Sequence, residues 1–428
     1  MTIKTALLGA VAAAPILAMA GAAQAQDVVS LRYMCTSDVG GCEIWGELLE
    51  GFHEANPGIR VAIESVAARA ITDTLPLQLE AGNDAPDLAN SIDLGGLNPY
   101  YLDLSPYIDV ADFEQNFGQT LPWLRGSNQD DKGVYGFQLY FTVNGGFVNS
   151  TLFEQAGIEL PGSDASWEDW AEASRKVAEA TGVQFPMAMD RSGHRFASMA
   201  ISYGAELVDA AGQPVIDDGL RAASQQIIDW NKDGTMPYEL WGGTGGTVGT
   251  NMIDDFKNAN IVFYYGGSWY LGQLERDVGD AFDWAVVDQP CGVAACTGMP
   301  GGNAVVALKT TKHPEEVAKV IEYMASDEVL EEFLARTQSL PAKQSLIDKG
   351  VEYGDVSEST AGALQKFNEQ LPKITEAAYR FQGYRFQRAM MNGIVQRIGQ
   401  AINGELSLDQ ALERIREETE TAITAAAR

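Results

Sequence analysis

Two aromatic side chains that follow a glycine pair are the most chemically suggestive feature of the sequence. Residues 264–270 read YYGGSWY and come directly after the apolar run IVF. The run predicts a strand, and the glycine pair predicts a tight turn that presents Trp269 and Tyr270. Rings at such a place either pack in a core or form a flat surface that holds a ligand. We expect the two tyrosines on the strand to be core, and Trp269 to face a cleft because it follows the turn.

Residues suited to catalysis are sparse. The chain has three histidines, His53, His194 and His313, and shows neither a Ser/His/Asp order nor an HExxH motif. A glycoside hydrolase would need two carboxylates about 5–10 Å apart, and it stays the enzyme alternative. The glycine-rich segment WGGTGGTVGT, residues 241–250, lacks the order of a phosphate-binding loop. It predicts a mobile cleft lip with an exposed Trp241. We therefore expect no catalytic residues and no enzyme activity.

Four cysteines form two close pairs along the chain. Six residues separate Cys35 from Cys42, and four separate Cys291 from Cys296. In an exported protein such spacing favours two local disulfides. A Cys₄ zinc site is the alternative, although these spacings fit zinc motifs poorly. We expect no metal and no cofactor.

The N-terminus predicts export. Residues 1–25 combine Lys4, a long apolar stretch and a final Ala-Gln-Ala, which is typical of a signal peptide cleaved after Ala25. A single-pass anchor is the alternative. No later apolar run reaches the roughly 18 residues of a membrane-spanning helix. The mature chain would carry 28 basic and 59 acidic residues, which argues against nucleic acid or an anionic membrane as partner. We expect a periplasmic monomer.

Strands and helices alternate along the first half of the chain. Apolar residues alternate in segments 28–34 and 59–66, and recur at helical spacing from Trp45 to Phe52. A helix over 71–81 and a strand over 87–92 complete a pattern that predicts a parallel sheet and an α/β fold. The pattern returns in the middle of the chain, where Ser166 and Asp169 predict a capped helix over 167–180. A strand over 184–189 and a helix over 219–234 follow. From Ser326 onwards the sequence is nearly all helical. At this length two lobes are expected.

Six segments in order resemble one family. They are FHEANPGIRVAIE, LEAGNDAPDLANS, the long stretch from GVYGFQLYFTVNGG to WEDW, FKNANIVFYYGGSWY, GMPGGNAVVALKTTKHPEE and LPAKQSL. Together they resemble the extracellular solute-binding proteins that deliver sugars to bacterial ABC importers, the maltose- and glycerol-phosphate-binding group. The resemblance spans the mature chain. It implies a two-lobed type II binding-protein fold with the ligand in a cleft between lobes joined by crossing strands. Lobe 1 would hold residues 26–140 and 300–343, and lobe 2 residues 141–299 and 344–428.

The resemblance and the strand ends together give candidate ligand-binding residues. The resemblance implies Trp269 as a stacking platform, Tyr140 and Thr142 at the first crossing, His194 after a strand, and Tyr384 and Arg385 near a late helix. Strand ends add polar residues at the cleft rim, and the return crossing adds two residues whose backbone N–H groups could approach a ligand. These further candidates are Ser37, Asp38, Ser91, Asp93, Arg191, Trp241, Tyr270, Gly302 and Asn303.

Sugars suit such a set of residues. A pyranose stacks its C–H face on a ring, while each buried hydroxyl needs a partner or costs roughly 1–3 kcal/mol. We expect a carbohydrate or polyol, released to the membrane permease of an ABC importer after the lobes close around it. An anionic sugar derivative, such as a sugar acid, a sulfonated sugar or a glycerol phosphodiester, is the alternative, because Arg385 could grip a charged head with two hydrogen bonds.

Overall fold

The computed structural model describes residues 28–37, 40–82, 84–126, 128, 130–242 and 251–427. Within these ranges eight strands form one sheet: β1 (Val29–Thr36), β2 (Ile59–Val66), β3 (Leu88–Ser91), β4 (Gly136–Asn149), β5 (Phe185–Met189), β6 (Ile261–Gly267), β7 (Trp284–Val286) and β8 (Pro300–Ala307). The α-helices of the same ranges are α1 (Gly41–Ala55), α2 (Ala68–Asp73), α3 (Leu75–Ala81), α4 (Val110–Phe117), α5 (Leu121–Leu124), α6 (Ser150–Ala156), α7 (Trp167–Thr181), α8 (Gly193–Ser202), α9 (Asp218–Asp233), α10 (Tyr238–Gly242), α11 (Ile253–Lys257), α12 (Leu271–Val278), α13 (Pro314–Met324), α14 (Asp327–Thr337), α15 (Gln344–Lys349), α16 (Glu358–Gln370), α17 (Glu376–Gln382), α18 (Gln387–Ile402) and α19 (Leu408–Ala426). Short 3₁₀ turns form η1 (Asn98–Tyr100), η2 (Ser268–Tyr270) and η3 (Leu371–Lys373).

The order of the strands confirms the predicted α/β class. They follow one another as β2–β1–β3–β8–β4–β6–β5, and β7 pairs with β4 beside this path. β1 is parallel to both β2 and β3, as helical crossovers require. β8 returns from far along the chain and inserts antiparallel between β3 and β4.

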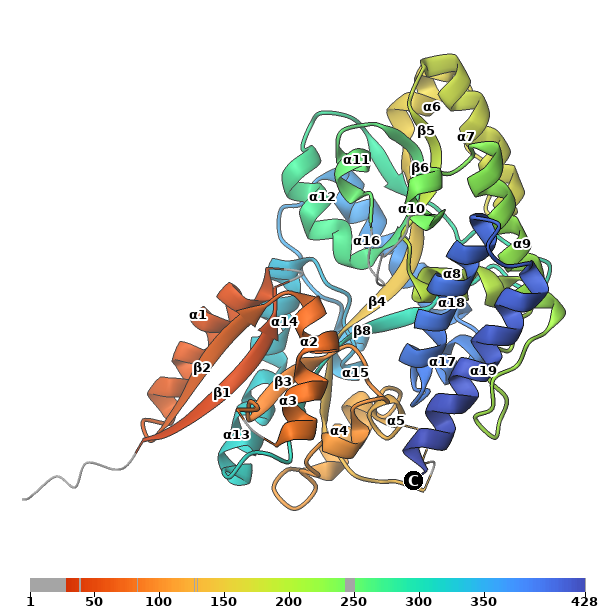
Figure 1. The fold of residues 1–428 in the computed structure, drawn as a ribbon. Helices are drawn as coiled ribbons and strands as arrows, with labels where there is room; N and C mark the ends of the chain where they lie inside the picture. The colour runs from red at the N-terminus through yellow and green to blue at the C-terminus, as the bar shows by residue number, and fades with distance from the viewer. Residues whose placement is uncertain are drawn as a thin grey trace, which may run out of the picture.

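One long strand joins the two lobes. Residues Gly136–Val143 of β4 pair with β8, whereas Asn144–Val148 pair with β6. Figure 1 shows β4 running from the part of the molecule that holds β1–β3 to the part that holds β5 and β6. Phe141 also pairs with Leu340, so the chain passes the crossing a third time. The predicted lobe boundaries at 140, 300 and 343 fall near these crossings and stay a prediction.

Two clusters of buried apolar side chains form the hydrophobic core. One lies between α1, α4, α13 and α14 and the first-lobe strands, where Trp45 and Phe333 stack with ring centroids 4.6 Å apart. The other fills the second lobe and the opposite face of the first-lobe sheet. The late helices α16 and α18 contact β7, α8 and α9 of the second lobe. Burial of these apolar faces contributes more to the stability of each helix than the intrinsic helix propensity of its residues.

The structure confirms one predicted helix start and corrects one predicted helix. Ser166 and Asp169 form the predicted capping box at the start of α7. The helix predicted over 71–81 is instead two helices that meet at Thr74, because Pro76 has no N–H for the hydrogen bond that would continue α2.

Both predicted disulfides are present. Cys35 is bonded to Cys42, and Cys291 to Cys296. The zinc alternative is therefore wrong. Among the described residues, no group of three or more His, Cys, Asp or Glu side chains could hold a metal ion.

No helix in the described part of the chain has the length and apolarity needed to cross a membrane. The predicted signal peptide, residues 1–25, lies outside the described residues.

Candidate ligand-binding site

A cavity of about 750 Å³ lies where the two lobes meet. The first lobe contributes α2 and the residues after β3, and the crossing strands β4 and β8 form its floor. The second lobe contributes the start of α8, η2, and the junction of α17 and α18. Polar and aromatic side chains converge from both lobes at strand ends, which is the usual place for a ligand in open α/β sheets.

A second hollow of about 590 Å³ lies along α14 and is lined mainly by acidic side chains. It has no aromatic lining residue. We therefore take the cavity between the lobes as the candidate site.

Trp269 reaches the cavity because glycine ends β6. The strand continues through Gly267, whose backbone is extended, and η2 follows at once. A Cβ atom at Gly267 would lie 2.0 Å from the Trp269 ring, so a side chain there would displace the indole. The predicted tight turn is thus wrong, since these glycines permit close approach rather than a reversal of the chain.

A buried carboxylate organises the wall beside Trp269. Asp190 follows β5 and accepts hydrogen bonds from the hydroxyls of Tyr264 and Tyr270 and from Arg195, whose Nη2 is 3.0 Å away. Burial raises the pKa of Asp190, while the positive charge of Arg195 and the hydroxyl donors oppose that rise. The Arg195 guanidinium also lies 4.0 Å from the centroid of the Trp269 ring. The indole and the guanidinium therefore hold each other in place.

His194 is held among oxygen atoms on the same side of the cavity. Its Nε2 lies 3.1 Å from both the Pro300 carbonyl oxygen and the Gln382 side-chain oxygen. Its Nδ1 lies 3.1 Å from the side-chain oxygen of Asn144. Burial, aided by the charge of Arg195, lowers the pKa of His194 to about 4, although the contacts to Gln382 and Pro300 oppose the shift. The ring is therefore neutral near pH 7, carries a single N–H, and donates from only one of its two nitrogens to these oxygen atoms.

Charged side chains around the cavity are paired. Arg69 contacts Asp73 at 3.2 Å within α2, and Arg388 of α18 reaches the same carboxylate across the cleft at 3.7 Å. Burial raises the pKa of Asp93, and the charge of Arg388 opposes that rise. The described lining includes three arginines and three aspartates. The wall thus offers fixed donors and acceptors with little net charge.

A family model for bacterial extracellular solute-binding proteins matches residues 43–331. This chain belongs to that family. Members of the family are exported proteins that bind solutes outside the cytoplasm and pass them to ABC permeases.

Individual relatives are distant but match most of the chain. The arabinooligosaccharide-binding protein of Bacillus subtilis is 21% identical over 67% of this chain and 67% of its own length. The fold resembles an ABC substrate-binding protein from Listeria monocytogenes solved with cycloalternan, with a TM-score of 0.76 and 18% identity over 93% of this chain and 100% of that one. It also resembles the GacH receptor of Streptomyces glaucescens, solved with and without acarbose, with a TM-score of 0.75 and 19% identity over 91% of this chain and 97% of that one.

Eight of the predicted site residues of this solute-binding protein line the cavity. Three come from the second lobe, four from the crossing strands, and one follows β3. They are Asp93, Tyr140, Thr142, His194, Trp269, Tyr270, Gly302 and Asn303. Tyr264 and Tyr265 are core, as predicted, because both are fully buried.

Three predicted residues are turned into the protein instead. Trp241 was expected on an exposed lip, but it is fully buried and its indole N–H donates to the Met189 carbonyl. Ser91 shares a hydrogen bond with Tyr101, and both residues are fully buried. The hydroxyl of Tyr384 donates to the Gly212 carbonyl. In each case a buried polar atom finds its partner away from the cavity.

The remaining predicted residues lie elsewhere. Arg191 is buried beside α18, where its Nη2 lies close to Gly399 rather than in the cavity. The Arg385 guanidinium lies over the ring of its neighbour Phe386, 5.4 Å from the centroid. Ser37 donates to the Val66 carbonyl at the solvent-exposed end of β1. Asp38 lies outside the described residues.

Several lining residues were missed from the sequence. Most come from α2 and α18, which carry helical patterns but no motif. They are Arg69, Thr72, Asp73, Asp190, Ser192, Gln382, Gln387, Arg388 and Met391. A useful signal existed for Asp190, because it is the first residue after the predicted strand QFPMAM.

Proposed function

We propose that this solute-binding protein captures a neutral carbohydrate or polyol in the periplasm and delivers it to the permease of an ABC importer. The observation that carries the proposal is the pairing of charge in the cavity. The lining arginines Arg69, Arg195 and Arg388 each lie within 4 Å of a carboxylate oxygen, with Arg69 and Arg388 sharing Asp73. The described lining balances these three arginines with three aspartates, which favours a neutral ligand over an anionic head group. The arabinooligosaccharide-binding relative from Bacillus subtilis supports the same class of ligand.

The chemistry of the wall matches the two surfaces of a sugar. Trp269 and Tyr270 supply ring surface for C–H faces, and Thr142, Asn303 and Asp93 supply polar groups near the floor. Because the lining comes from both lobes, a bound sugar bridges them and favours the closed form. It can do so only to the extent that it binds the closed form better than the open one.

We expect binding without turnover. Asp190 is held by Arg195, Tyr264 and Tyr270, which suits a structural carboxylate rather than one that exchanges protons with a substrate. Incubation with oligosaccharides, followed by chromatography, should therefore return them unchanged. We also expect a monomer whose signal peptide is removed after Ala25.

A thermal-shift screen tests the ligand class. The panel contains maltose, maltotriose, arabinotriose, tagatose, sorbitol and galacturonate. A ligand present at 100 times its Kd adds about 2.7 kcal/mol, which for a chain of this size raises Tm by about 3 °C. We expect neutral members to do so. A response to galacturonate alone would favour the anionic alternative, and no response to any member would remove the proposal.

A further inference from the structure

The first disulfide lies beside Thr36, the last residue of β1. Cys35 lies on β1 and Cys42 in the first turn of α1, and Thr36 follows Cys35 directly. The sulfur atoms lie 3.6 and 3.0 Å from the Thr36 carbonyl oxygen. Neither cysteine lines the cavity, and both are buried. The bond therefore fixes the path of the chain at Thr36 without touching a ligand.

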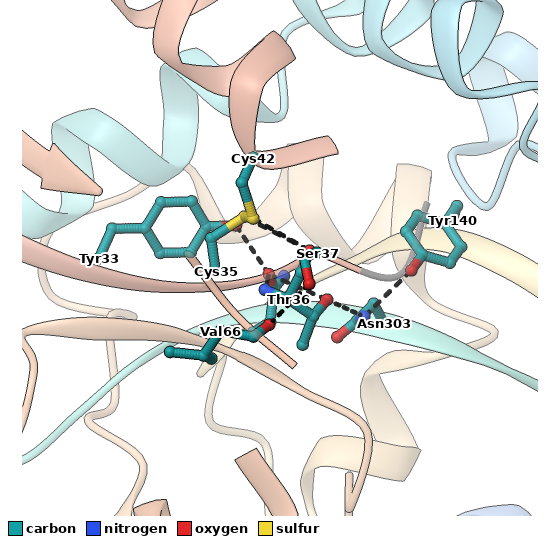
Figure 2. Close-up of a disulfide and its surroundings, with 9 residues drawn as sticks. Tyr33, Cys35, Thr36, Ser37, Cys42, Val66, Tyr140 and Asn303 are labelled. Atoms are coloured by element: carbon teal, nitrogen blue, oxygen red, sulfur yellow. Dashed lines mark hydrogen bonds between the residues drawn. A yellow bond between two sulfur atoms is a disulfide. The ribbon is translucent and has the colours of Figure 1, made fainter. Parts of the chain in front are cut away.

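Thr36 in turn holds a residue of the cavity floor. Its hydroxyl oxygen accepts a hydrogen bond of 2.8 Å from the side-chain amide of Asn303. The same amide donates to the hydroxyl of Tyr140 at 3.0 Å. Figure 2 shows this row, with the disulfide on one side of Thr36, Asn303 on the other, and Tyr140 beyond it. Asn303 and Tyr140 both line the cavity.

Asn90 fixes Thr36 from the side opposite Asn303 in this series of hydrogen bonds. The Thr36 N–H donates to the side-chain oxygen of Asn90 at 2.8 Å, and Tyr33 donates to the same oxygen at 3.2 Å. All of these side chains are at least nine-tenths buried. In a buried polar network a displaced member cannot turn to water, so its neighbours must shift with it.

The rest of Tyr140 is already fixed. Its ring is stacked near Phe333, with centroids 6.4 Å apart. Its carbonyl lies so close to Gly302 that a Cβ atom there would be 2.0 Å away. Packing thus sets the plane of the ring, and the contact with Asn303 bears on the direction in which the hydroxyl points.

We propose that the Cys35–Cys42 disulfide, acting through Thr36 and Asn303, positions the Tyr140 hydroxyl for a hydrogen bond to the bound sugar. Thr36 is a positioning residue here, and so are the two cysteines. The inference rests on the proposed function, and it makes affinity depend on a disulfide that the ligand never contacts. Without the bond, the row loosens and the hydroxyl loses its fixed direction.

A comparison of the two disulfides tests the proposal. The variant Cys35→Ala/Cys42→Ala removes the first, and Cys291→Ala/Cys296→Ala is the matched control, because it removes a bond of similar span away from the cavity lining. Titration calorimetry uses maltotriose, or the member of the panel that gives the largest thermal shift. Losing one oriented hydrogen bond should weaken binding about tenfold in the first variant. The control should stay within about twofold of wild type.

A double-mutant cycle separates positioning from general loosening. Tyr140→Phe removes the hydroxyl, so loss of the first disulfide should cost little more affinity in that background. Thr36→Val should reproduce the loss, and Thr36→Ser should restore binding because it keeps the hydroxyl. An equal loss with and without the Tyr140 hydroxyl would overturn the proposal, and so would an unchanged affinity in the first variant.

A measurement without ligand keeps the test independent of the proposed function. Backbone hydrogen exchange should quicken in residues 136–143 and 300–307 of the first variant and not of the control. If wild type binds no member of the panel, the proposed function fails while this measurement still decides whether the disulfide supports the floor. Faster exchange confined to residues 28–55 would overturn the positioning role.

Discussion

Removal of the Trp269 ring should abolish most of the affinity for a sugar while the fold survives. A tryptophan buries up to about 250 Å², so one ring face contributes roughly 100 Å² to a stacked ligand. At about 25 cal/mol per Å² this is worth about 2.5 kcal/mol. Arg195, which lies 4.0 Å from the ring centroid, would also lose its support, but that contact exists with and without ligand and so adds nothing to the binding energy. A loss of about 2.5 kcal/mol corresponds to a Kd weaker by about seventyfold.

The assay is calorimetric titration of Trp269→Ala with the tightest neutral ligand from the panel. Trp269→Phe should fall between the variant and wild type, because it keeps a smaller ring. Tyr107→Ala is the matched control, since that aromatic residue is exposed and does not line the cavity. Thermal unfolding should show a cooperative transition in all three variants. Binding by Trp269→Ala within about threefold of wild type would show that the indole only packs against its neighbours.

Three further outcomes follow from the same site. Gly267→Ala should displace the Trp269 ring, because the new Cβ would lie 2.0 Å from it, and both tryptophan fluorescence and affinity should change; an unchanged spectrum would contradict this. Since the pKa of His194 is lowered to about 4, protons favour the unfolded chain, and wild type should lose about 3 kcal/mol of stability as pH falls from 6.5 to 4. The free energy of unfolding in urea should fall less between pH 7 and pH 4 in His194→Gln than in wild type, because the variant lacks this histidine. An equal fall in both proteins would refute the assignment. Arg385→Lys should bind like wild type at low and high salt, because Arg385 does not line the cavity; a steep salt response would instead favour an anionic ligand.

The fold was largely predictable because its signals are local. Residues 59–66 alternate in polarity, and they form β2 with those bounds. Ser166 and Asp169 lie three residues apart and cap α7. The disulfide partners are five and seven residues apart, and in a chain with an export signal such short spacing predicted them. Each of these features depends on a short stretch of chain, where pattern and propensity are informative.

The site was less predictable because its contacts are distant in sequence. Trp241 lies beside a glycine-rich stretch that suggested a loop. It is nevertheless fully buried, and its indole N–H donates to the carbonyl of Met189, 52 residues away. Arg388 lies on a late helix, and its carboxylate partner Asp73, which also lines the cavity, comes from the other lobe. No local pattern shows which helix faces which across a cleft, because that depends on how the lobes pack.

The position of β8 has a consequence for how the chain acquires its fold. The first-lobe strands β3 and β4 do not pair with each other, because residues 300–307 lie between them. Until those residues have been synthesised, β3 and the N-terminal part of β4 each have an edge that is not paired with β8. Pairing between segments so far apart in sequence is slow, since the intervening chain must first be brought into a closed loop. The first lobe should therefore stay unfolded during most of synthesis, which is the state in which an exported chain can be threaded through a membrane channel.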